Sequence, residues 1–548
     1  MKKRLLVLSI LILITLPTFL PFFNTKFFYT QDYIFIARLN QMSTALADGH
    51  FPVRWAADLR YGEPIFNFYA PLPYYLGVPI HLLGFNFIWV AKILFILSSI
   101  LSAITMYILI EKLFGSRAAY FSAVLYTYAP YRAVDMYVRG SLSETWAFVF
   151  FPLIFYTSWQ LREKVSLKRT VFLALSLAGL FLTHNVTTLM FLPFLLLWWI
   201  YLILKKKQWK VMSYLIGGFI LGLGLSAFFL LPAVFERDLI QTKYLIVGYF
   251  NFRAHFVALF QFFSTFWGYG SSLWGIDDGL SFQVGLVNWA ILGLAVLLGI
   301  VERKNKKSIG LLLFLGVSFI LSLFLQHNKS AFVWEAFPLM AFIQFPWRFL
   351  AISIFIASIA GGVITPYLNK FKIIYFILIG LAIVSTVGYF RPKEYVDDIF
   401  FGKFLNKEKM HQGTDLTKDY LPIWVQTTDD KVFDYPKAED GKIENVSFDK
   451  KTAFAYAKVN VLTDSVIVAP ITYFPGWNVS TNEKNIDLEK PSPQGLIRFR
   501  LPKGEYNLRF EFKDTPVRIF GNYVSLISII IILIILQPIR LWRVKELS

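Results

Sequence analysis

The sequence predicts a polytopic α-helical membrane protein of about twelve spans, with a small β-sandwich near its C-terminus. Of its 548 residues, 56% are hydrophobic and only 16% are charged, whereas a soluble protein carries about a quarter charged residues. In residues 391–520 the pattern changes, because apolar and polar residues alternate there with the period of a β-strand. We therefore expect a multi-span domain over residues 1–390, a β-rich domain over 391–520, and a final span with its tail over 521–548.

The apolar runs have lengths that suit transmembrane helices. Residues 5–23 follow a short basic segment and form a longer run than the apolar part of a secretion signal, so we interpret them as a retained first span. Residues 71–84 are also apolar, but fourteen helical residues reach only about 21 Å, so we expect a juxtamembrane helix there. The predicted spans begin near residues 5, 87, 117, 145, 170, 186, 211, 283, 308, 348, 371 and 522.

The charges of the loops predict how the spans are oriented. If the N-terminus is cytoplasmic, the loops on that side carry 22 Lys and Arg against 4 acidic residues, and the other loops, apart from 391–520, carry 12 against 11. Positive residues concentrate on the cytoplasmic side of membrane proteins. We therefore expect a multi-pass protein of the plasma (inner) membrane, with cytoplasmic termini and an extracytoplasmic β-rich domain.

The net charge of +19 does not indicate a nucleic-acid-binding protein. Residues 391–520 carry 20 basic and 20 acidic residues, so the whole excess lies in the membrane part and reflects its cytoplasmic loops. The chain contains no cysteine, which excludes disulfides and thiolate metal sites within it. The lipid bilayer is the first partner that we expect.

On the predicted outer side, polar residues gather in four loops. The first of these, residues 24–86, is long enough to hold juxtamembrane helices, and long loops are usually functional. Ordinary solvated loop charges would explain each residue singly, but Arg139 and Glu144 head a span, where ionisable groups are costly unless they are paired or functional. The candidate site residues from these loops are Asp32, Arg38, Asp58, Arg60, Glu63, Arg139, Glu144, His184, Asn185 and Arg348.

Arginines and a carboxylate at the membrane surface suit a substrate with a lipid-linked phosphate. Arginine forks bind phosphate, and a carboxylate can deprotonate an acceptor hydroxyl. The spacings HExxH, DxD, GxGxxG and Walker A do not occur, so a lipid-borne donor is favoured over a cytosolic nucleotide, and a divalent metal is left open. We assign Asp32 and Glu144 as candidate catalytic residues, and Arg38, Arg139 and Arg348 as candidate phosphate ligands.

Four stretches resemble a bacterial membrane family labelled 6-pyruvoyl-tetrahydropterin synthase-related, which is itself similar to the GT-C glycosyltransferase superfamily. They are QDYIFIARL (31–39), GHFPVRWAADLRYGEPIFNFYAPLPYY (49–75), LYTYAPYRAVDMYVRGSLSETWA (125–147) and LTHNVT (182–187). The resemblance implies a GT-C-like domain that uses a polyprenyl-phosphate or polyprenyl-diphosphate sugar on the non-cytoplasmic face. A single displacement that inverts the configuration of the sugar is implied as well. It also implies that Asp32 is a catalytic base or a metal ligand, although Ile36 stands where many relatives have a histidine.

We therefore predict a glycosyltransferase that moves a sugar from a polyprenyl-phosphate donor to an envelope glycan, lipid or protein. The alternatives are a transporter that flips lipid-linked oligosaccharides and a non-catalytic scaffold for envelope assembly. Because a transporter should carry charges or broken helices at mid-membrane, the nearly charge-free spans favour catalysis at the outer surface. In the β-rich domain, YFPGWNV (473–479) resembles a motif of YfhO-type membrane proteins, and its Trp477 either contacts carbohydrate or fills the core.

Overall fold

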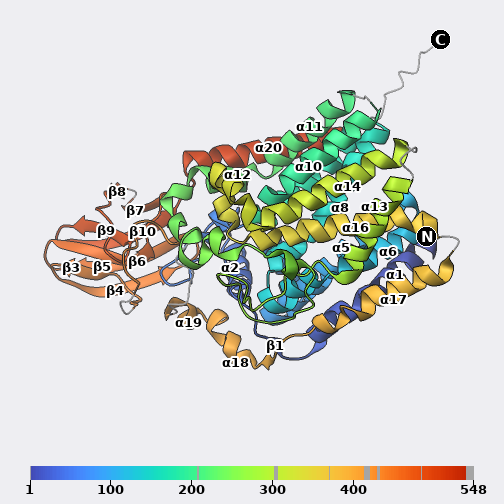
Figure 1. The fold of residues 1–548 in the computed structure, drawn as a ribbon. Coiled ribbons are helices and arrows are strands. Elements are labelled where there is room, and N and C mark those ends of the chain that lie inside the picture. The colour runs from blue at the N-terminus through green and yellow to red at the C-terminus, as the bar shows by residue number, and fades with distance from the viewer. Residues whose placement is uncertain are drawn as a thin grey trace, which may run out of the picture.

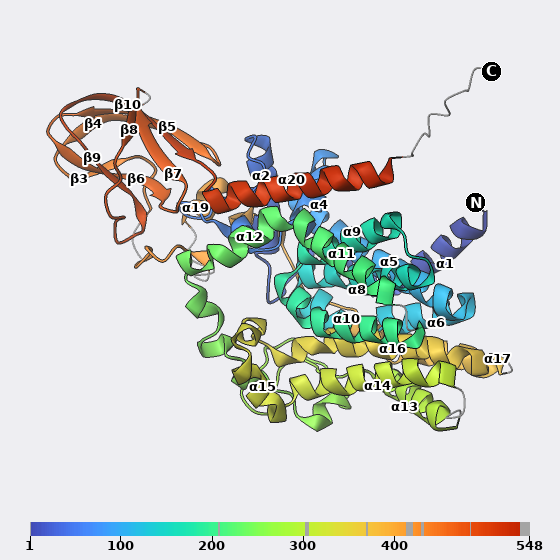
Figure 2. The same cartoon turned by 90° about the horizontal axis from the view of Figure 1, so that it is seen from above.

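The computed structural model describes residues 2–206, 209–301, 306–368, 371–412, 420–428, 432–482 and 484–537. A β-rich domain lies at one end of a helical body, and the N-terminal end of α1 lies at the other end (Figure 1). The view from above shows α20 running back along the helical body from the β-rich domain (Figure 2). The chain is a helical membrane protein with a C-terminal β-rich region, as its composition predicts.

Every segment that was predicted to span the membrane contains an α-helix. Helices suit such segments because all their backbone hydrogen bonds are made within the segment. These helices are α1 (Lys2–Phe19), α5 (Phe87–Phe114), α6 (Ser116–Thr127), α8 (Leu142–Glu163), α9 (Leu167–Phe181), α10 (Asn185–Lys206), α11 (Trp209–Leu225), α13 (Leu286–Val301), α14 (Lys306–Gln326), α16 (Leu350–Leu368), α17 (Lys372–Val384) and α20 (Pro516–Leu536).

Fewer than twelve of the described helices meet the length and hydropathy expected of a membrane span. Among the described residues, seven helices are long and apolar enough to cross a membrane, or eight if α11 and α12 (Ala227–Phe235), which are bent by 75°, form one broken span. By contrast, α6 has 12 residues, α9 has 15 and α13 has 16. At 1.5 Å per residue, such helices fall short of the roughly 30 Å hydrocarbon core. The predicted count of about twelve spans is therefore not established.

α16 lies at the centre of the helical body, and 94% of the apolar 18-residue stretch within Pro346–Leu368 is buried. It packs against α6, α13 and α14. Glycines permit this close packing, since a Cβ at Gly361 would lie 2.4 Å from the side chain of Leu125, and one at Gly362 would lie 2.9 Å from Ile110. Arg348 lies in the turn that leads into this central helix, so its backbone is held on a rigid support.

Short elements between the long helices form the surface that carries the candidate residues. α4 has 11 residues, in agreement with the prediction that residues 71–84 contain a helix too short to span. β1 pairs with β2 in an antiparallel ladder, which attaches the segment after α17 to the first loop. These elements are η1 (Leu20–Phe23), β1 (Phe27–Phe28), α2 (Phe35–Ala47), α3 (Ile65–Phe68), α4 (Leu72–Leu82), α7 (Pro130–Ala133), the π-helical turn η2 (Val134–Arg139), η3 (Arg237–Leu239), η4 (Thr242–Leu245), η5 (Gly248–Phe250), η6 (Phe252–His255), η7 (Leu259–Phe262), η8 (Asn328–Ser330), α15 (Ala331–Ala336), η9 (Pro338–Ile343), η10 (Pro346–Phe349), η11 (Val387–Tyr389), β2 (Tyr395–Val396), α18 (Asp398–Phe401), η12 (Gly402–Phe404) and α19 (Lys407–Gln412).

The β-rich domain consists of two antiparallel sheets that pack face to face, with strand orders β4-β5-β10-β7-β8 and β3-β6-β9. Side chains from both sheets, among them Val459, Phe499 and Phe510, share one buried core. Trp477 is 4% exposed, and its ring lies 5.6 Å from that of Trp55. This position supports the prediction that Trp477 fills the core of the sandwich, rather than the alternative that it contacts carbohydrate. The strands are β3 (Lys437–Asp440), β4 (Ile443–Lys450), β5 (Phe454–Val461), β6 (Ser465–Thr472), β7 (Trp477–Thr481), β8 (Lys484–Ile486), β9 (Leu496–Leu501) and β10 (Gly504–Phe512).

Buried ionic contacts join the β-rich domain to the helical body. Arg54 of the first loop donates from Nε to Asp514 Oδ1 at 2.9 Å. Arg518, at the start of α20, forms an ion pair of 3.0 Å with Glu236, which follows α12. These contacts place the end of the β-rich domain beside α12 and the first loop.

Candidate active site

A cavity of about 720 Å³ opens where the outer loops meet α10 and α12. Its lining comes from segments far apart in the sequence, including the start of α2, the turn before α8, the turn between α9 and α10, and residues 339–348. All of these segments lie on the predicted outer side of the membrane. Six of the ten candidate residues line this one cavity, namely Asp32, Arg38, Arg139, His184, Asn185 and Arg348.

The guanidinium of Arg139 is held by buried neighbours. Its Nη1 donates to Glu144 Oε2 at 2.7 Å and to Tyr131 Oη at 3.1 Å, and it also contacts Asp135. The guanidinium carbon lies 4.8 Å from the ring centre of Trp347. Glu144 is fully buried and does not line the cavity. Its position is therefore that of a residue that orients Arg139, rather than one that touches a substrate.

A glycine brings Asp32 next to Arg139. Gly140 adopts a φ of 66°, and a Cβ at this position would lie 2.4 Å from Thr30 Oγ1. This close approach lets the backbone N–H of Asp32 donate to the carbonyl of Arg139 at 2.8 Å. The residue pair Arg139-Gly140 thus fixes the first loop against the turn before α8.

Asp32 is the one acidic side chain among the described residues that line the cavity. Its side chain is 39% exposed, and Oδ2 lies 3.7 Å from Nη1 of Arg38. Oδ1 accepts a hydrogen bond from the backbone N–H of Ile34 at 3.2 Å, so the carboxylate keeps most of its acceptor capacity. Such a group can take a proton from a hydroxyl bound in the cavity. Within the described ranges, no group of three or more histidine or acidic side chains is placed to hold a metal ion.

Two arginines of the cavity have unused hydrogen-bond donors. The guanidinium carbon of Arg38 lies 4.0 Å from the ring centre of Tyr69, and Nη1 donates to Tyr74 Oη at 3.4 Å. Arg348 donates from Nη1 to the carbonyl of Ile343 at 2.9 Å. The Nε groups of Arg38 and Arg348 are buried and have no hydrogen-bond partner among the described residues. Both arginines line the cavity, so this part of its wall is cationic.

The turn between α9 and α10 adds neutral polar groups. The Nδ1 atom of His184 lies 2.6 Å from Thr187 Oγ1. Burial lowers the pKa of His184 to about 3, so the imidazole is neutral at physiological pH. Asn185 donates from Nδ2 to the carbonyl of Phe68 at 2.9 Å, which ties this turn to the first loop.

Part of the cavity wall is apolar. Leu189 of α10, Leu230 and Val234 of α12, and Leu339 of η9 contribute to it. Val234 and Leu339 are also 56% and 55% exposed, so the apolar wall reaches the outer surface of the helical body. The cavity is therefore amphipathic, with a cationic part and an apolar part.

Besides Glu144, three candidate residues lie outside the cavity: Asp58, Arg60 and Glu63. A backbone bridge between Ala56 and Glu63 turns this segment toward the β-rich domain. Asp58 accepts a hydrogen bond from Gln41 Nε2 at 3.0 Å, and Arg60 contacts the carbonyl of residue 428. The contact of Arg60 thus lies at the junction between the domains, whereas that of Asp58 lies within the first loop.

Sequence reasoning did not select three aromatic residues of the cavity, Tyr69, Trp347 and Tyr420. Tyr69 and Trp347 flank the guanidinium groups of Arg38 and Arg139. The position of Trp347 directly before Arg348 was a usable signal, because aromatic rings often support arginine side chains. Tyr420 has no comparable signal in its neighbourhood.

Residues 66–393 match the family described as the 6-pyruvoyl-tetrahydropterin synthase related domain, a membrane protein. An uncharacterized protein of Lactococcus lactis subsp. cremoris is 31% identical over 240 residues, which cover 41% of this chain and 38% of that protein. The fold is similar to that of an arabinofuranosyltransferase from Mycobacteria, with a TM-score of 0.44 and 15% identity over 72% of this chain and 27% of that one. It is also similar to an oligosaccharyltransferase from Archaeoglobus fulgidus, with a TM-score of 0.42 and 12% identity over 76% of this chain and 61% of that one.

The chain spans less than two thirds of the length of each of these three proteins. The family match covers more than half of the chain and includes the segments that supply Arg139, His184 and Arg348 to the cavity. The motifs in the first 200 residues had predicted the same membership. The chain belongs to the 6-pyruvoyl-tetrahydropterin synthase related family of membrane proteins.

Proposed function

We propose that this protein is a membrane glycosyltransferase that transfers a sugar from a polyprenyl-phosphate carrier to an acceptor on the outer face of the plasma membrane. The observation that carries the proposal is the amphipathic cavity, in which buried arginines, one open carboxylate and an apolar wall meet. A polyprenyl-phosphate sugar has matching parts, namely an anionic phosphate, a polar sugar and an apolar tail. The loop charges support the orientation that this reaction needs, with both termini cytoplasmic and the β-rich domain outside.

The arginines would bind the donor phosphate. Arg38 and Arg348 both line the cavity, where their guanidinium groups can donate to phosphate oxygens. Arg139, held by Glu144, adds a fixed positive charge beside them. The apolar wall formed by α10, α12 and η9 would let the first isoprene units leave the site toward the lipid.

The reaction would be a single displacement at the anomeric carbon of the sugar. The oxygen of the acceptor hydroxyl forms a bond to this carbon while Asp32 accepts the hydroxyl proton. The bond between the carbon and the phosphate oxygen breaks, and its electron pair leaves with the phosphate. The arginines stabilise the negative charge that grows on the leaving phosphate. This sequence inverts the configuration at the anomeric carbon.

The test is sugar transfer by the full chain, purified in lipid nanodiscs with radiolabelled polyprenyl-phosphate sugars and envelope acceptors. Asp32→Asn keeps the shape of the side chain but removes the base, so turnover should fall by about 100-fold or more while donor binding is retained. Asp397→Asn is the matched control, because Asp397 is an exposed acid outside the cavity.

Two results would contradict the proposal. One is full turnover by a correctly folded Asp32→Asn variant. The other is movement of the intact donor across the membrane by the unmodified protein, without cleavage of its sugar–phosphate bond, which would instead indicate a transporter. A protein that neither transfers nor moves any of these donors would be better described as a scaffold.

A further inference from the structure

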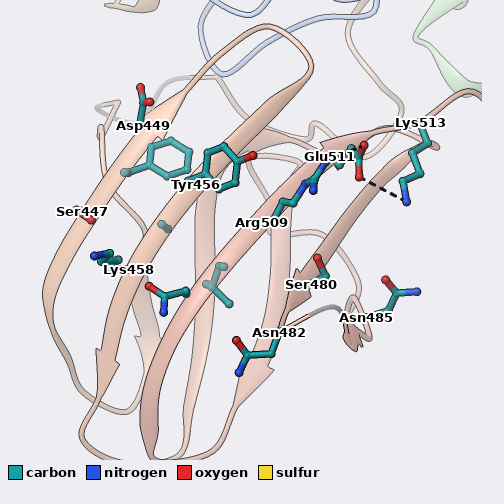
Figure 3. A pocket seen from close by; sticks show the side chains of 14 residues that line it. Ser447, Asp449, Tyr456, Lys458, Ser480, Asn482, Asn485, Arg509, Glu511 and Lys513 are labelled. Carbon is teal, nitrogen blue, oxygen red and sulfur yellow. Dashed lines mark ion pairs between the residues drawn. The ribbon is translucent and has the colours of Figure 1, made fainter.

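The outward face of the five-stranded sheet carries a concavity of about 740 Å³ that the proposed reaction does not use. Figure 3 shows side chains from several neighbouring strands projecting from this one face. None of its lining residues belongs to the lining of the membrane cavity. The opposite face of the same sheet packs into the core of the sandwich.

Strand register sorts the lining side chains into rows. One row crosses all five strands and consists of Asp449, Tyr456, Arg509, Ser480 and Asn485. A second row crosses three strands and consists of Ser447, Lys458 and Asn507. Because cross-strand partners lie on the same face of a sheet and close to one another, each row presents a continuous line of side chains to the concavity.

The neutral polar groups of this face are unused. No side-chain hydrogen bond to any described residue is made by Ser447, Ser480, Asn482, Asn485 or Asn507. The charged groups are largely paired with each other instead, since Glu511 lies 3.3 Å from Arg509 and 3.5 Å from Lys513. With three basic and two acidic residues in the lining, the face is close to neutral.

Two aromatic residues line the concavity, and one of them, Phe448, packs against the core of the sandwich. Tyr456 is 49% exposed, although its neighbours in β5, Ala455 and Ala457, are buried. A half-exposed ring offers a flat apolar surface, and the surrounding amides and hydroxyls can donate and accept hydrogen bonds. A sugar ring has the complementary form, with an apolar face and a rim of hydroxyl groups.

Other classes of ligand fit this face less well. Nucleic acid would need a strong excess of basic residues. A peptide strand that extends the sheet would need a free edge, whereas the concavity lies on the face. A lipid surface would need a patch of exposed large apolar side chains, but among the described lining residues Tyr456 is the one large hydrophobic side chain that is exposed.

We propose that this face of the β-rich domain binds a neutral glycan chain. The ring of Tyr456 stacks on one sugar, and the Asn and Ser side chains bind hydroxyl groups along the rows. This binding is separate from the transfer reaction proposed above and does not require the membrane cavity.

The test is glycan binding by the full chain in nanodiscs. The probes are neutral oligosaccharides of glucose, mannose, galactose and N-acetylglucosamine, titrated into millimolar concentrations and followed by microscale thermophoresis. At least one of them should bind, and Tyr456→Ala should weaken this binding by about threefold to tenfold, the range expected for one aromatic contact. Asn485→Ala should weaken it as well. Tyr435→Ala is the matched control, because Tyr435 is 55% exposed but lies outside the concavity.

The proposal is overturned if none of the four probes binds, if anionic vesicles or acidic peptides bind in their place, or if Tyr456→Ala and Asn485→Ala both bind like the unmodified protein. Asp32→Asn separates this binding from the transfer reaction. We expect that variant to bind the oligosaccharide normally, whether or not it transfers a sugar.

Discussion

The molecule contains two buried arginine groups that differ in how their donors are used. At the junction, Arg54 donates from Nε to Asp514, from Nη1 to the carbonyl of Phe228, and from Nη2 to Asn522, at 2.9 to 3.0 Å. In the cavity, by contrast, the side-chain hydrogen bonds that Arg38 and Arg348 donate to described residues come from Nη1 alone, to Tyr74 and to Ile343 and Gln344. A saturated arginine holds parts of a structure together, whereas an arginine that borders an open cavity can also bind a ligand there. Arg38 and Arg348 border such a cavity and Arg54 does not, so the comparison contrasts a structural cluster with a candidate binding site.

The largest effect is expected at the junction. Glu236 accepts hydrogen bonds from Asn67 Nδ2 at 2.7 Å and from Arg518 Nε at 3.0 Å. Glu236→Ala would leave the guanidinium of Arg518 buried without its counter-ion. The free energy of unfolding should therefore fall by about 3–5 kcal/mol, as measured by denaturant titration in mixed micelles.

An exposed ion pair provides the control for this prediction. Lys26 and Asp397 are 2.6 Å apart, and their side chains are 53% and 70% exposed. Asp397→Ala should change the free energy of unfolding by no more than about 1 kcal/mol. If Glu236→Ala were no more destabilising than Asp397→Ala, the junction would not be the structural cluster described above.

A smaller effect is expected in the cavity. Arg139→Lys keeps the positive charge but loses the guanidinium fork that Glu144 orients. The KM for a polyprenyl-phosphate donor should rise by about tenfold, which corresponds to one charge-assisted hydrogen bond, while kcat changes less. Arg253→Lys serves as the control, because Arg253 pairs with Glu335 at 2.8 Å on the surface. A fall in kcat at constant KM would show that Arg139 does not act in donor binding.

The smallest effect concerns pH. Burial lowers the pKa of Lys450 to about 8, and its Nζ donates to the carbonyl of Ala57 at 3.0 Å. Between about pH 8 and the ordinary lysine pKa near 10.4, the unfolded chain binds more protons than the folded chain, so stability should rise with pH in this window. Lys450→Gln should flatten that rise in thermal unfolding scans. Lys451→Gln should not, because Lys451 is half-exposed, and equal profiles for both variants would refute the prediction.

Much of the helical body could be predicted from apolar runs, since each predicted segment does contain a helix. The number of spans could not, because α6 and α9 are too short to cross by themselves and their tertiary partners decide how they lie. The strands of the β-rich domain could be predicted for a similar reason, because apolar and more polar residues alternate along β5.

The site could be predicted only in part, because the loop charges show which residues share one side of the membrane but not which of them meet. Asp32, Arg139 and Arg348 meet because their loops share that side. Asp58 was predicted with them, but the bridge at Ala56 turns its segment toward the junction. Side-chain direction within a loop depends on such tertiary contacts, and the sequence pattern does not contain it.

The central claim is that the arginines that line the cavity bind the donor phosphate. The most direct measurement is the affinity of a polyprenyl monophosphate for the purified chain in nanodiscs, compared among the unmodified protein, Arg348→Ala and Arg253→Ala. Loss of the Arg348 donors should weaken binding by about tenfold to a hundredfold, and Arg253→Ala should leave it unchanged. Equal affinity of all three proteins would contradict the claim.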